Sequence, residues 1–447
     1  MAERVPLQEG FLDTIIRVNW PGRPFLIIGG ASRFATGAGG RICRSNDGIT
    51  WTPVPFDGVT LNCGAYGNGV WVLSGGRRTT GQLNDTDTFY ISTDGARTFK
   101  EIANHPLSGV NMVCKGVAFG NGRFGVVSVT AGGSSVGATA RAATSEDGIH
   151  WVTHDVPLSG GTFNLTGFDF TAGKFVICGS ERKIYGSGSG ITYLFFYNWV
   201  THTPSYTPLV PVTVFNGKVS TSEDCALWSS PVNPFAGLRH PDEVDIDSSG
   251  NITLRNPTNP SESVTLPYYL PTSADLVTTR DTNADFVMQG AAEGEPIVLA
   301  RLDFSGPLPF GTSLARSTDG GSSWSLVSTL NSLGGDYIAP AHLAGNPNVP
   351  QSGMFRYGDG RFVSASETPP AGTGKPAEWW VSGDGNSWSK VGTGPRVTYA
   401  GENTPPAYGK NKFVLTTLGT DVYVSDTAAG WRNANFRRAG YWWRVIY

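Results

Sequence analysis

Charged residues are scarce in this sequence, and those present do not gather into a cluster of one sign. Asp, Glu, Lys and Arg make up 15% of the 447 residues, and the formal net charge at pH 7 is −3. No run of Lys or Arg provides the basic footprint that nucleic-acid-binding proteins usually carry. We therefore expect no nucleic-acid partner.

Long apolar runs and paired cysteines are also missing. No stretch approaches the roughly 20 consecutive apolar residues that a membrane-spanning helix needs, so we expect no membrane insertion. The cysteines show no C-x-x-C spacing, which predicts buried free thiols, no metal site and no cofactor. Residues 1–6 carry no apolar segment, so we expect synthesis in the cytoplasm without a secretory signal peptide. The five cysteines are Cys43, Cys63, Cys114, Cys178 and Cys225.

Glycine, proline and aromatic residues are plentiful, and one short phrase recurs among them. The 59 glycines and 29 prolines suit an all-β protein with many tight turns. The phrase Ser-x-Asp-Gly-x-x-Trp has five clear copies, of which two are one residue longer, and two eroded copies. The clear copies are residues 45–51, 92–99, 145–151, 317–324 and 382–388, and the eroded copies are 222–228 and 425–431.

A glycine-containing turn and an aromatic residue precede most copies at a constant distance. Residues 67–72 read Gly-Asn-Gly-Val-Trp-Val, and Asn-Gly between apolar runs predicts a tight hairpin turn. Trp71 precedes Ser92 by 21 residues, and Phe124 precedes Ser145 by 21. The same phrase serines follow Phe25, Ile297 and Phe362 by 20 residues. This constant register predicts a structural repeat.

Each repeat unit is expected to contain two hairpins and therefore four strands. A four-stranded unit of about 50 residues cannot bury both of its faces alone, which is the condition that a propeller blade satisfies. We predict an all-β fold in which residues 1–447 form a single seven-bladed β-propeller of four-stranded antiparallel blades. Residues 437–447 are expected to form a last outer strand, which the N-terminal segment completes.

The recurring phrase resembles the Asp-box, or BNR, repeat of sialidases, sortilin-type receptors and other propellers. This resemblance implies a structural turn, in which the Asp side chain accepts backbone hydrogen bonds and the aromatic residue packs against the blade. The chemistry agrees, because Asp and Ser mimic backbone turns and Gly supplies positive φ. The residues assigned to this structural role are Asp47, Asp94, Asp147, Asp224, Asp319, Asp384, Trp51, Trp151, Trp228, Trp324 and Trp388.

Two further resemblances lead to different functions. The combination of glycine turns and short boxes resembles propellers of bacteriophage tails and other virion proteins, which implies a virion location after synthesis in the host cytoplasm. Sialidases use an arginine triad and a Tyr nucleophile, but residues 41–43 read Arg-Ile-Cys and do not match the Arg-Ile-Pro-like motif of that family. We assign no catalytic residue.

Two insertions interrupt the regular spacing around the fourth box, at residues 182–214 and 230–283. Both are expected to leave the same face and to form one lobe at blades 4 and 5. The aromatic residues of these insertions suit a partner interface or a sugar face, although they suit the core of the lobe equally well. The candidate contact residues are Tyr193, Phe196, Tyr197, Trp199, Tyr206, Tyr268 and Tyr269.

Three functions remain open. The first is a non-enzymatic virion protein, a tail component or receptor-binding protein that acts through the insertion face. Its expected partners are other virion proteins and a host surface glycan or protein, within an oligomeric assembly. The second is a sialidase-like, glycan-active hydrolase with an axial pocket. The third is a propeller-type assembly factor.

Overall fold

The computed structural model describes a protein built of β-strands and connecting turns. In the described part of the chain, no helix has the length and apolar character needed to cross a membrane. The described residues are 23–30, 40–77, 86–110, 112–130, 139–157, 163–185, 192–198, 201, 203–209, 212–234, 245–246, 251–256, 259–267, 286–288, 297–302, 312–327, 356–366, 377–385, 387–395, 406–416, 421–434, 436 and 441–447.

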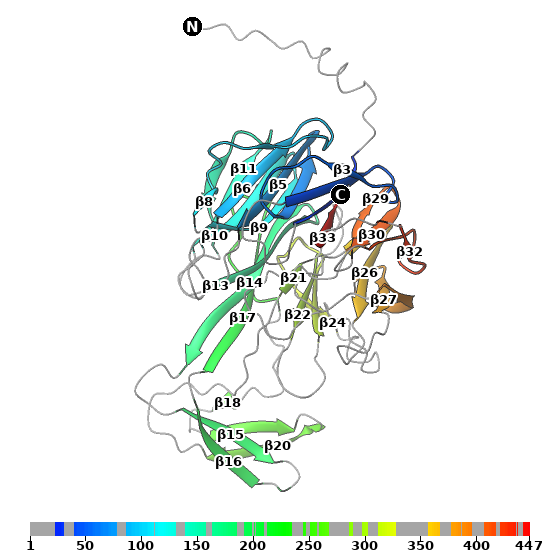
Figure 1. The fold of residues 1–447 in the computed structure, drawn as a ribbon. Coiled ribbons are helices and arrows are strands. Elements are labelled where there is room, and N and C mark those ends of the chain that lie inside the picture. The colour runs from blue at the N-terminus through cyan, green and yellow to red at the C-terminus, as the bar shows by residue number, and fades with distance from the viewer. Residues whose placement is uncertain are drawn as a thin grey trace.

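The first blade combines strands from the two ends of the sequence. It contains β1 (Phe25–Gly30), β2 (Gly40–Ser45), β3 (Thr52–Val54) and β33 (Tyr441–Ile446), in the order β3-β2-β1-β33. All neighbouring strands are antiparallel. Figure 1 shows the blue strands of this blade close to the C-terminal end of the chain.

Five further sheets follow the same four-strand path. The second blade also carries β8 (Gly109–Val110), which pairs with β6. The strands of these five blades are β4 (Leu61–Gly67), β5 (Val70–Arg77), β6 (Thr86–Ser92) and β7 (Lys100–Glu101); β9 (Met112–Gly120), β10 (Arg123–Thr130), β11 (Ala140–Ser145) and β12 (Val152–Asp155); β21 (Phe286–Met288), β22 (Ile297–Leu302), β23 (Thr312–Ser317) and β24 (Ser325–Val327); β25 (Arg356–Gly358), β26 (Arg361–Ser366), β27 (Ala377–Ser382) and β28 (Ser389–Gly394); and β29 (Ala407–Gly409), β30 (Lys412–Thr416), β31 (Val422–Ser425) and β32 (Arg432–Asn433).

The fourth repeat forms only a three-stranded sheet, of β13 (Phe163–Thr171), β14 (Lys174–Tyr185) and β17 (Val212–Ser222). An isolated bridge between Val219 and Val232 stands where a fourth strand was expected. Prolines at positions 231 and 234 flank this bridge, and each removes a backbone donor that a strand would need. The structure therefore shows six four-stranded blades, and the prediction of seven is wrong.

The structure gives no evidence for one lobe built from both insertions. The ends of the first insertion continue the long strands β14 and β17, which pair as far as Tyr185 and Val212. Beyond them, two separate sheets form, with no strand pairing between them among the described residues. Their strands are β15 (Thr192–Asn198) and β16 (Thr203–Leu209) in one sheet, and β18 (Asp245–Ile246), β19 (Asn251–Asn256) and β20 (Asn259–Pro267) in the other.

The constant spacing in the sequence corresponds to one strand pairing that recurs in every repeat. In each case the residue after the glycine turn lies directly opposite the box serine on the neighbouring strand. Even the three-stranded sheet keeps this pairing. The pairs are Phe25 with Ser45, Trp71 with Ser92, Phe124 with Ser145, Phe175 with Ser222, Ile297 with Ser317, Phe362 with Ser382 and Phe413 with Ser425.

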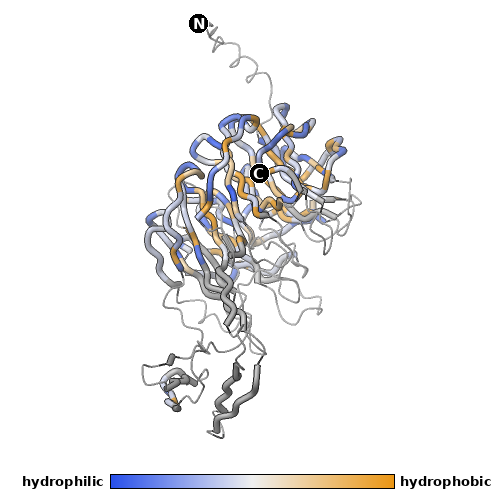
Figure 2. Tube along the Cα trace, turned by 90° about the vertical axis from the view of Figure 1, so that its left-hand side faces the viewer, coloured by the Kyte–Doolittle hydropathy of each residue, from blue (hydrophilic) through white to orange (hydrophobic). Residues whose placement is uncertain are grey.

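The apolar residues of the central strands fill the space between neighbouring sheets. The side chains of Trp71 and Trp379 and of the aromatic residues opposite the box serines are fully buried. Figure 2 shows hydrophobic segments along the strands and hydrophilic segments at many turns. This alternation is expected for sheets that bury both faces against neighbours while their turns face water.

Adjacent blades also fit together through a repeated contact between a glycine and an aromatic ring. The glycine that ends the first strand of one blade lies under an aromatic ring from the first strand of the next, so that a Cβ there would collide with the ring. These positions therefore require glycine for close approach. The pairs are Gly67 with Phe119, Gly120 with Phe170, Gly358 with Tyr408 and Gly409 with Tyr447.

Side chains from the glycine turns form hydrogen bonds between blades. Asn121 Nδ2 donates to the carbonyl oxygens of Gly173 (3.0 Å) and Glu223 (2.8 Å) in the next sheet. Asn68 makes the equivalent pair of bonds one blade earlier. Both asparagines have positive φ, which this residue type tolerates better than most. Each turn therefore connects two neighbouring sheets.

Replacing Asn121 by Gly and by Ala separates these bonds from the backbone requirement. Asn121→Gly removes both bonds but suits the φ of 49°, so we expect a loss of about 1 kcal/mol of unfolding free energy. Asn121→Ala adds backbone strain, and we expect a total loss of about 2 kcal/mol. Equilibrium denaturant unfolding measures both losses. Equal stability of the wild type and Asn121→Gly would contradict the role of the bonds.

The C-terminal strand occupies an inner position. The first strands of neighbouring sheets contact one another, and β33 contacts β4 in the same way. The expectation that this segment forms an outer strand is therefore wrong. The physical reason is that β1 follows the second-strand pattern, with Phe25 opposite Ser45, so the first blade lacks only its inner strand.

Further contacts hold the two ends of the described chain together. The rings of Phe25 and Tyr447 lie 4.5 Å apart between their centroids. The Arg23 guanidinium lies 4.7 Å from the Tyr447 ring centroid and 5.3 Å from that of Tyr66. Burial, together with the charge of Arg356, lowers the pKa of Arg23 to about 10. Arg23 thus bridges the first and second blades through cation–π contacts.

Candidate functional site

The box turns are the most regular feature of the blade surface. In the first box the Ser45 hydroxyl donates to Asp47 Oδ1 (2.8 Å) and accepts from the Gly48 N–H (2.8 Å). Asp47 Oδ1 also accepts from the N–H groups of Ile49 (2.8 Å) and Thr50 (2.7 Å). The same Ser–Asp bond recurs at Asp94, Asp147, Asp224, Asp319 and Asp384. These carboxylates serve their own turns.

Indole groups complete the turns in most boxes. The Trp51 Nε1–H donates to the Gly48 carbonyl at 3.1 Å, and Trp151, Trp324 and Trp388 repeat this bond. In the fourth box the corresponding glycine is replaced by Cys225, at a φ of 59°, and the buried Trp228 Nε1 has no hydrogen-bond partner. This box is the one whose blade lacks a fourth strand.

Hydrogen bonds also set the charge state of the box carboxylates. Partial burial would raise the pKa of Asp94, but bonds from the hydroxyl and N–H of Thr98 and from Ser92 lower it to about 2. The pKa of Asp319 is lowered chiefly by the Ser323 hydroxyl. Carboxylates with lowered pKa values stay ionised at neutral pH and are poor general acids. We therefore do not assign them catalytic roles.

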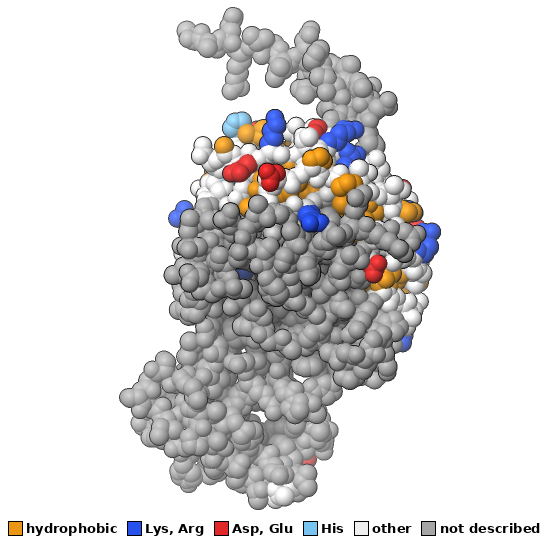
Figure 3. Space-filling model, viewed as in Figure 1, with side chains coloured by type: hydrophobic (Ala, Val, Ile, Leu, Met, Phe, Trp, Pro, Cys, Tyr) orange, Lys and Arg blue, Asp and Glu red, His pale blue; other side chains and the backbone are white. Residues whose placement is uncertain are grey.

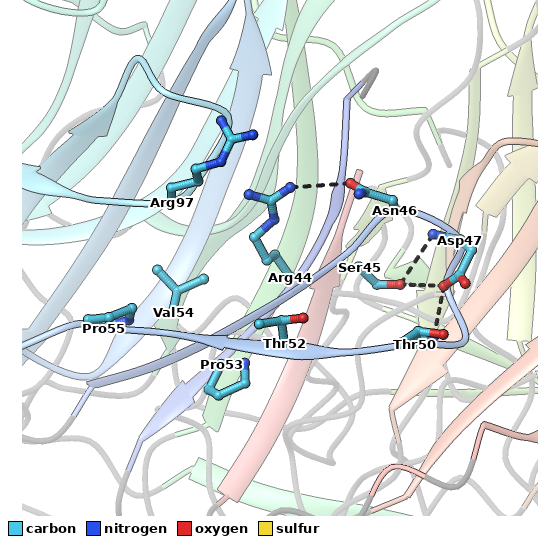
Figure 4. A pocket seen from close by; sticks show the side chains of 10 residues that line it. All are labelled: Arg44, Ser45, Asn46, Asp47, Thr50, Thr52, Pro53, Val54, Pro55 and Arg97. Carbon is cyan, nitrogen blue, oxygen red and sulfur yellow. Dashed lines mark hydrogen bonds between the residues drawn. The ribbon is translucent and has the colours of Figure 1, made fainter. Parts of the chain in front are cut away.

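A groove of about 490 Å³ lies beside the first box. This volume falls in the range of small-molecule sites. Figure 4 shows its lining, with the side chains of Arg44 and Arg97 on neighbouring elements of the first and second blades. The lining residues are Arg44, Ser45, Asn46, Asp47, Thr50, Thr52, Pro53, Val54, Pro55 and Arg97.

The electrostatics of the groove are set by its two arginines. Burial lowers the pKa of Arg44, the positive charge of Arg97 lowers it further, and the charge of Asp94 opposes both. Arg44 Nη2 donates to Asn46 Oδ1 at 3.4 Å, and Arg97 Nη1 donates to the Asp94 carbonyl at 2.8 Å. Each of these bonds uses one donor of a group that has five. Two guanidinium groups that repel each other favour an anion between them.

The aromatic residues predicted as contact sites do not line this groove. Tyr193, Phe196 and Tyr197 lie in β15, and Tyr206 lies in β16. Trp199, Tyr268 and Tyr269 lie outside the described residues. Their contact role stays a prediction.

Sequence reasoning missed Arg44 and Arg97 because the boxes were interpreted only as turns. Arg44 directly precedes the first box serine, and Arg97 occupies the lengthened part of the second box. Strand pairing alone does not reveal that the two boxes border one groove.

The rest of the described surface carries no comparable cluster of chemistry. Figure 3 shows Lys and Arg side chains interspersed with Asp and Glu over the coloured part of one face. No group of three or more His, Cys, Asp or Glu side chains is placed to hold a metal ion among the described residues. The groove is therefore the candidate site.

Comparison with known proteins supports the fold alone. No protein-family model matches the sequence, and no curated protein matches it. Similar solved structures include the polysaccharide lyase Uly1 (TM-score 0.44, 10% identity, covering 88% of this chain and 83% of the lyase). The β-propeller domain of the Trilobed protease from Pyrococcus furiosus gives a TM-score of 0.31 at 7% identity, with coverages of 85% and 96%.

A sialidase is also among the similar structures. The Trypanosoma rangeli sialidase in complex with sialic acid gives a TM-score of 0.31 at 11% identity, and the match covers 84% of this chain and 48% of the sialidase. These neighbours are enzymes with different activities, and identities this low transfer none of them to this chain. The chain is an all-β propeller whose neighbours include sialidase propellers.

Proposed function

We propose that this protein is a non-enzymatic binding protein, in which the propeller is a rigid support and the groove beside the first box binds an acidic glycan. The observation that carries the proposal is the pair of guanidinium groups, Arg44 and Arg97, which come from two blades and line one groove. Guanidinium groups bind carboxylates through paired, charge-assisted hydrogen bonds.

The remaining lining suits a saccharide. Thr50, Thr52 and Asn46 are exposed and offer hydroxyl and amide groups to sugar hydroxyls. Pro53 and Pro55 add rigid apolar surface to the same wall. A polar groove held by two blades is also pre-organised, which reduces the entropy lost on binding.

The setting that we propose is a virion, where the protein is a tail component or receptor-binding protein. The support for this setting is the wording of the repeats and the expected cytoplasmic synthesis, so it is tested separately from the groove. Electron microscopy of particles labelled with an antibody against this chain provides that test. Label on the tail supports the virion role, and unlabelled particles from a culture that makes the protein contradict it.

Binding is tested with 3′-sialyllactose and tri-galacturonate, each paired with its neutral methyl ester. We expect the wild-type protein to bind at least one of the acids, and each ester at least about tenfold more weakly, because the ester loses the ionic bonds. Arg44→Ala and Arg97→Ala should each weaken binding of the acid by about tenfold or more. Isothermal titration calorimetry measures both effects.

Arg361→Ala is the matched control. Arg361 is also a surface arginine, paired with Asp359 at 2.7 Å, but it belongs to another blade. Its replacement should leave glycan binding unchanged. Equal affinity for acid and ester, or equal affinity of the wild type and both groove variants, would contradict the proposal.

A further inference from the structure

Two cysteines that are far apart in the sequence meet between adjacent blades. Cys63 lies in β4, Cys114 lies in β9, and their sulfur atoms are 3.5 Å apart. Both side chains are buried, and both belong to the same apolar cluster as Phe89 and Phe124. The sequence contains no motif that predicts this pair, because 50 residues separate them.

Backbone features hold the two sulfur atoms in place. The pairing register shifts next to Cys63 in β4, and the ladder of β9 shifts next to Cys114. The Cys114 N–H donates to the buried carboxylate of Asp87, and its sulfur lies 3.4 Å from the Gly116 carbonyl oxygen. Neither cysteine lies on a loop, so the closeness of the sulfur atoms is a property of the packed blades.

We propose that Cys63 and Cys114 are an inter-blade cross-linking site, at which a disulfide forms when the protein meets a disulfide oxidant. A disulfide requires the sulfur atoms to approach to about 2.05 Å, a displacement of about 1.5 Å from their present separation. The bond joins the inner strands of the second and third blades. It therefore prevents these blades from separating.

The chemistry balances with oxidised glutathione as the oxidant. The thiolate of one cysteine attacks a sulfur of oxidised glutathione, forms a mixed disulfide and releases one glutathione thiolate. The second cysteine, after losing its proton, attacks the protein sulfur of that mixed disulfide and releases the second glutathione. The two protein thiols are oxidised, the oxidant is reduced to two thiols, and the protein loses two hydrogen atoms.

The surroundings also determine how fast this reaction proceeds. Burial, assisted by the hydrogen bond with Cys63, raises the pKa of Cys114 well above its usual value. Only a small fraction is thiolate at neutral pH, so oxidation should be slow and should accelerate as the pH rises. Asp87 lies close to Cys114, and its negative charge disfavours the thiolate further.

Peptide mass spectrometry under non-reducing conditions tests the proposal on the full folded chain. After incubation with oxidised glutathione at pH 8.5, free thiols are blocked with iodoacetamide during unfolding. We expect a cross-linked peptide pair that contains Cys63 and Cys114, and a melting temperature about 4 °C above that of the reduced protein. Free alkylated thiols at both positions, or glutathione retained on either one, would overturn the proposal.

Two variants separate the cross-link from other effects of oxidation. Cys63→Ala should lose the difference in melting temperature between oxidised and reduced samples, even if the variant is less stable overall. Cys43→Ala, which removes a buried cysteine of the first blade, should keep the whole difference. If Cys63→Ala keeps the difference, the stabilisation comes from another site and the proposal fails.

Discussion

Deleting residues 441–447 should abolish the cooperative folding of this protein. The deletion removes β33, which pairs with β1 over the length of the first blade, and it removes Tyr447 from its position over Gly409. Val445 and Ile446 are buried, and each contributes about 1.5–3 kcal/mol through burial alone. The summed loss of more than about 5 kcal/mol approaches the whole stability of a typical domain.

Calorimetry and size-exclusion chromatography measure this result. The truncated protein should show no sharp thermal transition and should form aggregates, because β1 is left with an unpaired edge. Val445→Asp should reproduce much of the defect by placing a charge in the core. Asn433→Asp, at an exposed position of the outer strand β32, is the control and should melt like the wild type. A truncated protein with wild-type melting would show that β33 does not close the ring.

Acidification from pH 6.5 to pH 4.5 should destabilise the folded protein by roughly 2.7 kcal/mol through one histidine. His105 is buried, its ring stacks on Phe89 with centroids 3.7 Å apart, and its Nδ1 accepts from the Leu107 N–H. Burial lowers the pKa of His105 to about 3. The unfolded chain therefore takes up a proton near pH 6.5 that the folded protein rejects.

The sign of this effect follows from the lowered pKa. Stability from the neutral His105 is complete above about pH 6.5 and is lost progressively as the pH falls towards 3. The box carboxylates also have lowered pKa values, but most of their loss occurs below pH 4, where the unfolded groups become protonated. The interval from pH 6.5 to pH 4.5 therefore reports mainly on the histidine.

Denaturant unfolding of wild type and His105→Phe across this interval separates the two contributions. Phe preserves the stack on Phe89 and Trp151 but cannot bind a proton. The unfolding free energy of the variant should change little between pH 6.5 and pH 4.5. Parallel pH profiles for both proteins would show that His105 is not the responsible group.

The repeat could be predicted from the sequence because its signals are local. The spacing from Trp71 to Ser92 is constant across units because both residues face each other in one strand pair. The box turns are equally local, since each Asp carboxylate accepts hydrogen bonds from residues only two to four positions away. Such features depend little on the rest of the fold.

The blade count, the position of β33 and the groove could not be predicted, because they depend on contacts between distant segments. Pro231 and Pro234 limit the fourth repeat to a bridge, although its box resembles the others. The pairing of β33 with β1 joins opposite ends of the sequence. Arg44 and Arg97 meet only because two blades pack side by side.

The most direct test of binding without catalysis is a time course of 3′-sialyllactose and tri-galacturonate with the purified full chain, followed by nuclear magnetic resonance. Saturation-transfer difference spectra detect binding, and the anomeric signals of the same samples detect cleavage. We predict saturable transfer to at least one of the two acids, its loss in Arg44→Ala and Arg97→Ala, and no free monosaccharide over a day. Release of free sugar at an enzymatic rate, or the absence of transfer to both acids, would contradict the account.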